Sequence, residues 1–444
     1  MFDRGHVRPN ILLAYPVMLS MLGQVMTGVA DSIMVGWIGA TPLAASSFSN
    51  TFFSITLLFG IGISYAITPL VAHASGSGNR VEVSHVLRHG MLINLITAAL
   101  LTGFLFLMMP WMYEMGQPSE VVELAIPYLV VVAPSIIPTM IFQTYRQFGE
   151  GLQHTRMAMV IVILSNLLNI ILNYLLIYGK FGLPEMGLLG AGWATLISRC
   201  CMGLAMALYI FYGRSFKLYR HGFKTGNYAL ARIKSMLHIG VPAGAQFIFE
   251  AGAFGFSSIM MGWLGTVPLA AHQIALNLAT ISYMITSGMG AAATIRIGHF
   301  FGKGDVQNLR SSGFTMFWMA AALMLFWAII FIAGQNLFPT IYISDPAVIN
   351  VSAGLLVVGA FFQLSDGIQV VATGALRGLQ DVKIPGLLIF VAYWILALPV
   401  GYWLTFHRGW GPQGIWMGLL IGLTLSALAT IWRFNRLSSE LNRR

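Results

Sequence analysis

Twelve long apolar stretches follow one another along this chain of 444 residues. Each is long enough for one helix to cross the hydrocarbon core of a bilayer, which takes about 20 residues. They lie at 10–38, 42–72, 89–112, 122–146, 156–178, 187–213, 232–264, 269–300, 311–335, 346–376, 384–406 and 412–435. Transmembrane β-barrels consist of shorter segments that alternate in polarity, so these continuous stretches favour helices. The sequence predicts an all-α integral membrane protein with about twelve transmembrane helices.

The composition excludes soluble and disordered proteins. Hydrophobic residues make up 57% of the chain and charged residues 9%, whereas a soluble domain carries about 25% charged residues. Disorder requires the opposite balance of hydrophobicity and charge. The two cysteines, Cys200 and Cys201, are adjacent within an apolar stretch and provide no disulfide framework. The first stretch is too long for the apolar part of a signal peptide, so we expect it to be retained.

Basic residues fall on one side of the predicted helices. If the N-terminus is inside, all but three of the 24 Lys and Arg residues lie in inside segments. The exceptions are Lys180 and Arg408 in outside segments and Arg199 within an apolar stretch. Such a bias marks the cytoplasmic side of a membrane protein. Both termini are therefore predicted to be cytoplasmic, and the net charge of +10 requires no nucleic-acid partner.

The second half of the chain repeats the first at an offset of 226 residues. The repeated residues include Ser32-Ile33-Met34 with Ser258-Ile259-Met260, Gly36-Trp37 with Gly262-Trp263, Pro16 with Pro242, Gly62 with Gly288 and Thr68 with Thr294. Gly151-Leu152-Gln153 recurs as Gly378-Leu379-Gln380 at an offset of 227. Because each half has six predicted helices, both halves enter the membrane from the same side. We expect two pseudo-symmetric six-helix bundles, at 1–213 and 232–444, joined by a cytoplasmic linker at 214–231, an arrangement typical of transporters.

Three carboxylates lie well inside predicted helices: Asp31, Glu250 and Asp366. A charged side chain at the centre of the membrane costs about 2.5–3.5 kcal/mol on insertion scales, so a functional role is the first hypothesis. The alternative is a buried carboxyl group that is hydrogen-bonded to a neighbouring helix. No Lys lies well inside the predicted helices, and Arg199 is the one basic residue that does. This balance favours the binding of cations or protons.

Polar side chains accompany the two acids of the second half. Gln246 lies one turn before Glu250, and Gln369 and Thr373 share a helix face with Asp366. Gln273 and Asn277 lie one turn apart on the next predicted helix, 269–300. Phe362 lies on the same face as Asp366. The oxygen atoms of these side chains are of the kind that bind hard cations, or that stabilise a carboxyl group in either protonation state.

In the first half, Asn166, Asn169 and Asn173 line one face of a predicted helix, and Asp31 is a possible partner. Hydrogen bonds between helices are an equally good explanation of these three amides. The His residues are scattered without the spacing of metal ligands. No Ser–His–Asp or Cys–His grouping indicates a nucleophilic enzyme.

Three segments resemble the multidrug and toxic compound extrusion (MATE) family: Asp31-Ser-Ile-Met-Val-Gly, Pro268-Leu-Ala-Ala-His-Gln-Ile-Ala and Gly374-Ala-Leu-Arg-Gly-Leu-Gln-Asp381. The resemblance extends over essentially the whole chain. It implies a V-shaped pair of six-helix bundles in the inner membrane of a bacterium. It also implies a monomer that exports small cationic or lipophilic drugs by antiport with Na⁺ or H⁺ and needs no other cofactor.

The position of the acids is similar to the NorM-like branch of this family. Glu250 and Asp366 match its C-half cation site, where Na⁺ is a possible ligand. Asp31 matches the carboxylate of the first span, and Asn169 and Asn173 match polar positions near it. Some Na⁺-coupled relatives have a Tyr where this chain has Phe362, and the substitution removes a hydroxyl ligand.

Other functions fit the sequence less well. A flippase for a lipid-linked precursor would bind a large anion, and a basic cavity would then be expected. A membrane-embedded enzyme with a metal site usually places paired acids near the membrane surface, whereas these three acids are on separate predicted helices. A channel is disfavoured by twelve non-identical helices. Drug efflux is the predicted function, with lipid flipping as the alternative.

Overall fold

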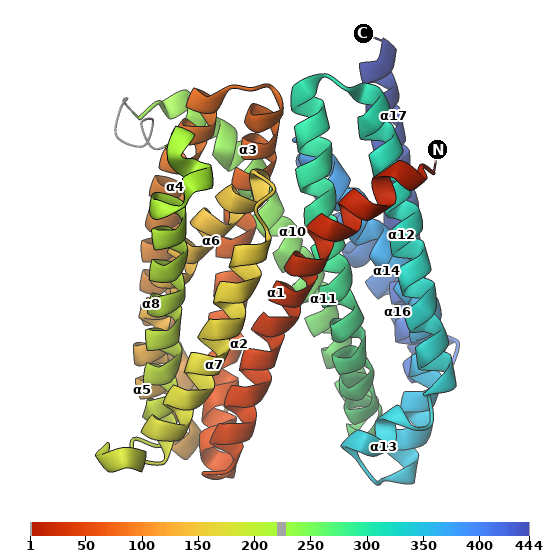
Figure 1. Ribbon diagram of the computed structural model, residues 1–444. Helices are drawn as coiled ribbons and strands as arrows, with labels where there is room; N and C mark the ends of the chain where they lie inside the picture. The colour runs from red at the N-terminus through yellow and green to blue at the C-terminus, as the bar shows by residue number, and fades with distance from the viewer. Residues whose placement is uncertain (1, 220–227, 444) are drawn as a thin grey trace. The chain divides into compact units, whose positions relative to one another are not determined.

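A computed structural model describes residues 2–219 and 228–443 (Figure 1). This part of the chain is helical and contains no strand, which confirms the predicted all-α fold. Its long helices are α1 (Arg4–Gly36), α2 (Ala40–Ser64), α3 (Ile67–Gly76), α4 (Arg80–Met108), α5 (Ser119–Val132), α6 (Ile136–Gly151), α7 (Arg156–Ile177), α8 (Leu188–Tyr212), α10 (Leu230–Trp263), α11 (Thr266–Lys303), α12 (Val306–Ala333), α14 (Pro346–Gly378) and α17 (Pro412–Arg443). The short helices are α13 (Phe338–Tyr342), α15 (Lys383–Phe390) and α16 (Leu398–Tyr402).

Eleven helical segments of the described chain are long and apolar enough to cross a membrane. The sequence predicts about twelve, and the difference is the predicted stretch 232–264. It does form a long helix, α10, but this helix is not among the eleven apolar ones. Polar and charged residues are the reason: Arg232, Lys234, Gln246 and Glu250 all lie on α10. The chain is therefore a multi-pass membrane protein in which the seventh predicted stretch forms an unusually polar helix, α10.

The predicted linker at 214–231 is described only in part. Arg214–Tyr219 forms a short 3-10 helix, and α10 has begun by Leu230. Residues 220–227 lie outside the described residues, and with them Arg220 and Lys224 of the predicted basic loop.

The helices form two compact units. The N-unit comprises Leu19–Gly244, and the C-unit comprises Ala245–Arg444 together with Met1–Met18. Both unit borders therefore lie inside long helices, α1 and α10, rather than in the predicted linker. Met18 and Gly244, the residues at the two borders, are separated by the offset of the sequence repeat.

Close helix contacts explain why the borders lie there. A Cβ added to Gly62 on α2 would lie 2.3 Å from the Cα of Gly244, so the beginning of α10 packs directly on the N-unit. A Cβ added to Gly288 on α11 would lie 2.6 Å from the backbone nitrogen of Met18, so the beginning of α1 packs on the C-unit. Glycine permits both approaches because it has no side chain.

The repeat also appears in hydrogen bonds and turns. The Thr68 hydroxyl donates to the carbonyl oxygen of Gln147 at 3.2 Å, and the Thr294 hydroxyl donates to that of Gly374 at 2.8 Å. The turn after α6 has Gln153 at φ 65°, and the turn after α14 has Gln380 at φ 62°. The two halves therefore share a local fold that the sequence repeat predicts.

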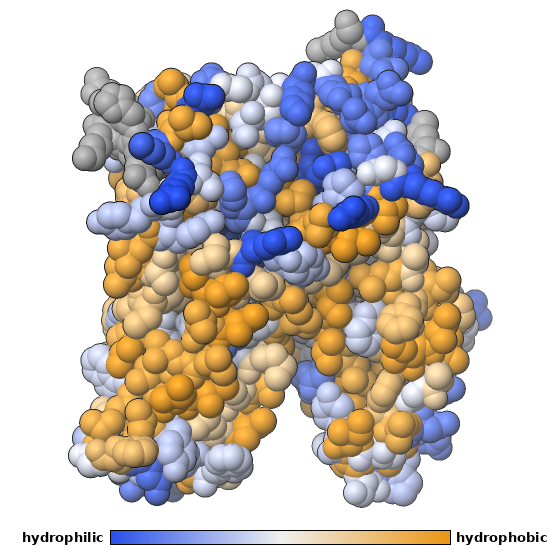
Figure 2. All heavy atoms as spheres, in the orientation of Figure 1, coloured by the Kyte–Doolittle hydropathy of each residue, from blue (hydrophilic) through white to orange (hydrophobic). Residues whose placement is uncertain are grey.

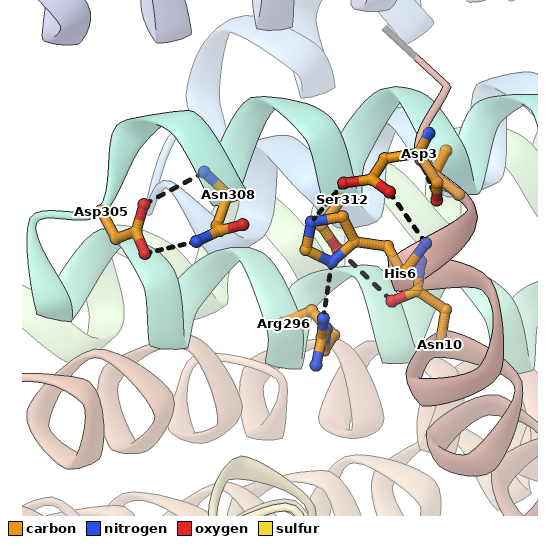
Figure 3. Close-up of polar contacts among 9 residues, drawn as sticks. Asp3, His6, Asn10, Arg296, Asp305, Asn308 and Ser312 are labelled. Atoms are coloured by element: carbon orange, nitrogen blue, oxygen red, sulfur yellow. Dashed lines mark hydrogen bonds and ion pairs between the residues drawn. The ribbon is translucent and has the colours of Figure 1, made fainter.

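The first turns of α1 are attached to the C-unit by polar contacts (Figure 3). The backbone nitrogen of Asp3 donates to the Thr315 hydroxyl at 3.0 Å. Nη2 of Arg296 lies 2.9 Å from Nδ1 of His6, whose side chain is buried. Because a guanidinium group only donates hydrogen bonds, this His6 nitrogen is the acceptor.

Each unit has its own apolar core. In the N-unit, buried side chains of α2, α4, α5 and α8 meet, among them Phe53, Leu105, Leu129 and Ala191. In the C-unit, two clusters lie along α14, one with Leu355 and Trp416 and the other with Leu376 and Phe434. On each unit the visible surface is largely hydrophobic in its middle, and hydrophilic side chains gather at one end (Figure 2). Such a surface is suited to a bilayer.

Candidate functional site

Glu250 and Asp366 lie in the same unit. Glu250 is on α10, and Asp366 is on α14. Gln369, one turn after Asp366 on α14, donates a hydrogen bond to Glu250, so the part of α14 that carries Asp366 lies against Glu250 on α10. The structure therefore brings together the two acids of the second half, which lie far apart in the sequence.

Two amide groups hold the Glu250 carboxylate. Nε2 of Gln246, one turn earlier on α10, donates to Oε1 of Glu250 at 3.1 Å. Nε2 of Gln369 on α14 donates to the same oxygen at 3.2 Å. Tyr393 in turn donates its hydroxyl to Oε1 of Gln369 at 3.3 Å. The result is a continuous chain of hydrogen bonds from Tyr393 to Glu250.

Asp366 has no such support. Its side chain is almost fully buried, with a residue exposure of 4%, and within the described residues no group donates a hydrogen bond to its carboxylate. Buried oxygens of this region that have no partner in the described part of the chain include Oε1 of Gln246 and the hydroxyl of Thr373. Buried polar atoms are normally paired, so these oxygens are free to accept a ligand.

Close packing of α14 against α11 and α12 places Asp366 in the interior of the C-unit. A Cβ added to Gly374 would lie 2.1 Å from the carbonyl oxygen of Gly290, and one added to Gly367 would lie 2.3 Å from the Met324 side chain. Small residues at these points let the helices approach. Larger residues would move α14, and with it the carboxylate.

Aromatic rings surround the same region. Phe362 is buried, and its ring lies 6.0 Å from that of Phe254 and 5.6 Å from that of Trp416. The ring of Tyr393 lies 5.9 Å from Phe254 on another side. Phe362 therefore supplies an apolar wall beside Asp366 on α14, and the phenolic hydroxyl that bonds within this region belongs to Tyr393.

Gln273 and Asn277 lie apart from this hydrogen-bonded chain. Both are on α11 with exposed side chains. Within the described residues neither is bonded to Glu250 or Asp366. Their neighbour His272 is buried instead, and its Nδ1 accepts a hydrogen bond of 2.9 Å from the indole of Trp416.

The N-unit contains a separate polar group around Asp31. Nδ2 of Asn173 on α7 donates to Oδ1 of Asp31 at 2.5 Å and also contacts Oδ1 of Asn169 at 3.2 Å. The Thr195 hydroxyl lies 3.5 Å from Oδ2 of Asp31. The predicted pairing of Asp31 with the asparagine face of α7 is therefore present. Arg199 acts on the charge of Asp31 and donates to Ser135 at 2.7 Å.

Asn166 forms a hydrogen bond between helices, the second of the two roles that the sequence allows for these asparagines. Its Nδ2 donates to the backbone carbonyl of Gly23 at 2.6 Å, which is a hydrogen bond between helices α7 and α1. It does not contact Asp31. The three asparagines of one helix face thus divide between helix packing and support of a carboxylate.

The repeat shows that the acid pair belongs to the second half alone. At the offset of 226, Glu250 corresponds to Gln24, and at the offset of 227, Asp366 corresponds to Thr139. The first half therefore has neutral residues where the second half has two carboxylates. The two units share a fold but carry different charges.

Sequence reasoning missed two features. One is Tyr393, which is one of many aromatic residues in an apolar stretch. At the offset of 227 it corresponds to the polar residue Asn166, and this correspondence could have indicated a polar role. Arg146 and Glu150 appear to be at a helix end, yet both are buried in α6 and form an ion pair of 2.7 Å. Within the described residues, no three His, Cys, Asp or Glu side chains come together as at a transition-metal site.

Comparison with known proteins places the chain in a family. The model of the MatE family matches residues 16–175 and 242–403, once in each half. The chain is 33% identical over 439 residues to "Multidrug resistance protein NorM" of Photobacterium profundum, covering 97% of this chain and 95% of the relative. It is also 33% identical over 441 residues to "Multidrug resistance protein MdtK" of Yersinia pseudotuberculosis, covering 98% and 96%.

Solved structures show the same fold. A crystal structure of a MATE protein in a bent conformation has a TM-score of 0.91 at 20% identity, with 100% of this chain and 99% of that chain covered. The eukaryotic MATE transporter AtDTX14 has a TM-score of 0.87 at 18% identity, with 99% and 98% covered. The family match in both halves and the full-length relatives confirm the resemblance seen in the sequence: the chain belongs to the MATE family and is a NorM-like member of it.

Proposed function

We propose that this protein is a secondary multidrug efflux transporter that exports small cationic or lipophilic drugs by antiport with Na⁺ or H⁺. The observation that carries the proposal is Asp366, a buried carboxylate with no hydrogen-bond donor among the described residues, beside a second carboxylate, Glu250. The relatives named as multidrug resistance proteins support the substrate class.

An unpaired buried carboxylate needs compensation. Burying a charge without a partner is expensive, so the group must take a proton, bind a metal cation or bind an organic cation. Coulomb attraction is stronger in a low-dielectric interior, which favours binding of a lipophilic cation there. Because each ligand neutralises the same two acids, binding of one weakens binding of the others.

This competition provides the coupling. Organic cation and coupling ion must prefer different states of the transporter for their movements to be linked. We infer that the drug binds the ionised acids from the cytoplasmic side and that Na⁺ or H⁺ replaces it from outside. For Na⁺, the ligands would be the two carboxylates and the unpaired Oε1 of Gln246, which are the hard oxygen donors that such an ion prefers.

We further propose a place and an orientation. The distribution of basic residues supports cytoplasmic termini, and the bacterial relatives support the inner membrane. The Glu250 and Asp366 group is formed within one unit of one chain, so a monomer is sufficient for it.

Transport in liposomes tests the proposal. Purified protein is reconstituted, ethidium is supplied as the fluorescent cation, and a Na⁺ gradient and a pH gradient are imposed separately. We expect ethidium movement under at least one gradient and the loss of this movement in Asp366→Asn. Thermal unfolding of the variant checks that it is folded. Absence of movement under both gradients would contradict antiport and direct attention to lipid flipping. Full activity of folded Asp366→Asn would contradict the assigned site.

A further inference from the structure

We propose that Tyr393 is a positioning residue for antiport, because its hydroxyl fixes which end of the Gln369 side chain faces Glu250. This inference rests on the proposed function and concerns the same site. Tyr393 does not contact either carboxylate by a hydrogen bond within the described residues; it acts through Gln369.

The two ends of the Gln369 amide have different partners. Its Oε1 accepts the Tyr393 hydroxyl at 3.3 Å, and its Nε2 donates to Oε1 of Glu250 at 3.2 Å. An amide turned the other way would direct its oxygen at a carboxylate oxygen, which is repulsive. The Tyr393 hydroxyl therefore favours the orientation in which Gln369 supports an ionised Glu250, the form that attracts a cation.

Burial makes this contact consequential. Gln369 and Tyr393 are each 1% exposed, so water cannot readily replace the hydroxyl. Without it, Oε1 of Gln369 would be a buried acceptor with no donor, and a lost hydrogen bond of this kind costs about 1–3 kcal/mol. Rotation of the amide would not relieve that cost, because it would leave the amide N–H unpaired instead and would lose the Glu250 contact.

The backbone around Tyr393 is held against α10 on both sides of Glu250. Tyr393 lies in a π-helical segment, Val391–Ala397, a form that is frequent at functional sites. The next residue, Trp394, donates its indole N–H to the carbonyl oxygen of Phe249 at 3.0 Å. Its ring also lies 3.0 Å from the position that a Cβ on Gly252 would occupy. These contacts fix the position of the Tyr393 hydroxyl along α10 relative to Glu250.

One amide thus connects three elements. Gln369 is on α14, three residues after Asp366; it donates to Glu250 on α10 and accepts from the π-helical segment. Charged or titratable groups that act on this cluster from the packed helices are Arg377 on α14 and Tyr283 on α11. The donor that the structure gives for Oε1 of the amide is the Tyr393 hydroxyl.

The test measures binding and transport in Tyr393→Phe. Tyr402→Phe is the matched control, since Tyr402 lies on the following helix, α16, and is 43% exposed. For Tyr393→Phe we expect the Kd and KM for tetraphenylphosphonium to rise about tenfold, which corresponds to the loss of about 1.4 kcal/mol. The maximal transport rate should stay within about twofold, and Tyr402→Phe should match the wild type. An unchanged Kd in folded Tyr393→Phe would overturn the inference.

A double-mutant cycle separates this role from general packing. Because the hydroxyl acts only through the amide, Gln369→Leu should weaken binding by at least as much as Tyr393→Phe, and the double variant should equal Gln369→Leu alone. If the fold-changes in Kd of the two single variants instead multiply in the double variant, Tyr393 acts by a route other than Gln369, and the inference is overturned. Gln369→Leu also provides the test if Tyr393→Phe does not fold.

Glu250→Gln distinguishes the failure of this inference from the failure of the proposed function. In that background Tyr393→Phe should change the Kd less than twofold, because no carboxylate remains for Gln369 to support. If Glu250→Gln alone leaves binding and transport unchanged, the proposed function fails. If Glu250→Gln loses both but Tyr393→Phe retains wild-type affinity, only the positioning role of Tyr393 fails.

Discussion

Nε of Arg146 lies 2.7 Å from Oε1 of Glu150, and both members of this ion pair are buried in α6 with side-chain exposures of 1% and 2%. Removal of water from two charges costs several kcal/mol for each, which the attraction between them offsets only while both are present. The pair therefore makes the N-unit sensitive to a single substitution at either residue and tolerant of matched substitutions at both.

We predict that Arg146→Met destabilises the N-unit by about 3–5 kcal/mol, because Glu150 is left charged and buried. Arg146→Met combined with Glu150→Leu should restore most of the loss, since two apolar side chains of similar volume need no compensation. Thermal unfolding in detergent measures both variants. Equal stability of Arg146→Met and the wild type would show that the pair contributes nothing.

Gly374→Ala should destabilise the C-unit. Its Cβ would lie 2.1 Å from the carbonyl oxygen of Gly290, so α11 and α14 must separate. Overpacking of this kind costs about 1–3 kcal/mol. Gly103→Ala on α4 is the control, because a Cβ there meets nothing within 4 Å, and helix propensity predicts no loss or a gain of up to about 1 kcal/mol. A fall in the unfolding temperature of the control equal to that of Gly374→Ala would contradict the contact.

The first turn of α12 should depend on pH through Asp305, which lies between two membrane-spanning helices. Its side chain accepts a hydrogen bond from the backbone N–H of Asn308 at 3.1 Å and another from the Asn308 side chain at 2.7 Å. These bonds lower the pKa of Asp305. A lowered pKa in the folded state stabilises the fold above the unfolded pKa of about 3.9, and the contribution is lost as pH falls through the folded value.

Asn79 provides a neutral counterpart to Asp305. It caps α4 at the equivalent repeat position, where its side chain accepts from the backbone N–H of Glu82 at 3.0 Å. We predict that Asp305→Ala and Asn79→Ala each cost about 1 kcal/mol near neutral pH. The cost of Asp305→Ala should shrink below about pH 4, whereas the cap lost in Asn79→Ala has no charge to titrate. The free energy of unfolding of both variants is measured in detergent across this pH range. The same dependence on pH in both variants would rule out a charged cap at Asp305.

Much of the fold was predictable because its determinants are local. Apolar length gives the helices, and the offset between the halves gives the equivalent turns at Gln153 and Gln380. Helical periodicity likewise places Gln246 beside Glu250. Asp31 and Asn173 follow from complementary polar faces.

The remaining features depend on tertiary packing. Hydropathy does not show that α1 and α10 are each divided between two units, because that depends on contacts at Gly62 and Gly288. A basic residue near a helix end is typical of a cytoplasmic loop, and only the packing of α6 shows that Arg146 is buried. Tyr393 was missed because its hydroxyl becomes important only beside Gln369.

Competition at the acid pair tests the central claim most directly. Equilibrium binding of tetraphenylphosphonium to the purified protein is measured while Na⁺ is titrated at fixed pH, and then while pH is lowered at fixed Na⁺. The account predicts that at least one of these ions raises the Kd for the organic cation in the wild type and that folded Asp366→Asn loses this competition. Binding that neither ion affects, in a protein that still transports the cation, would contradict the claim that drug and coupling ion share Glu250 and Asp366.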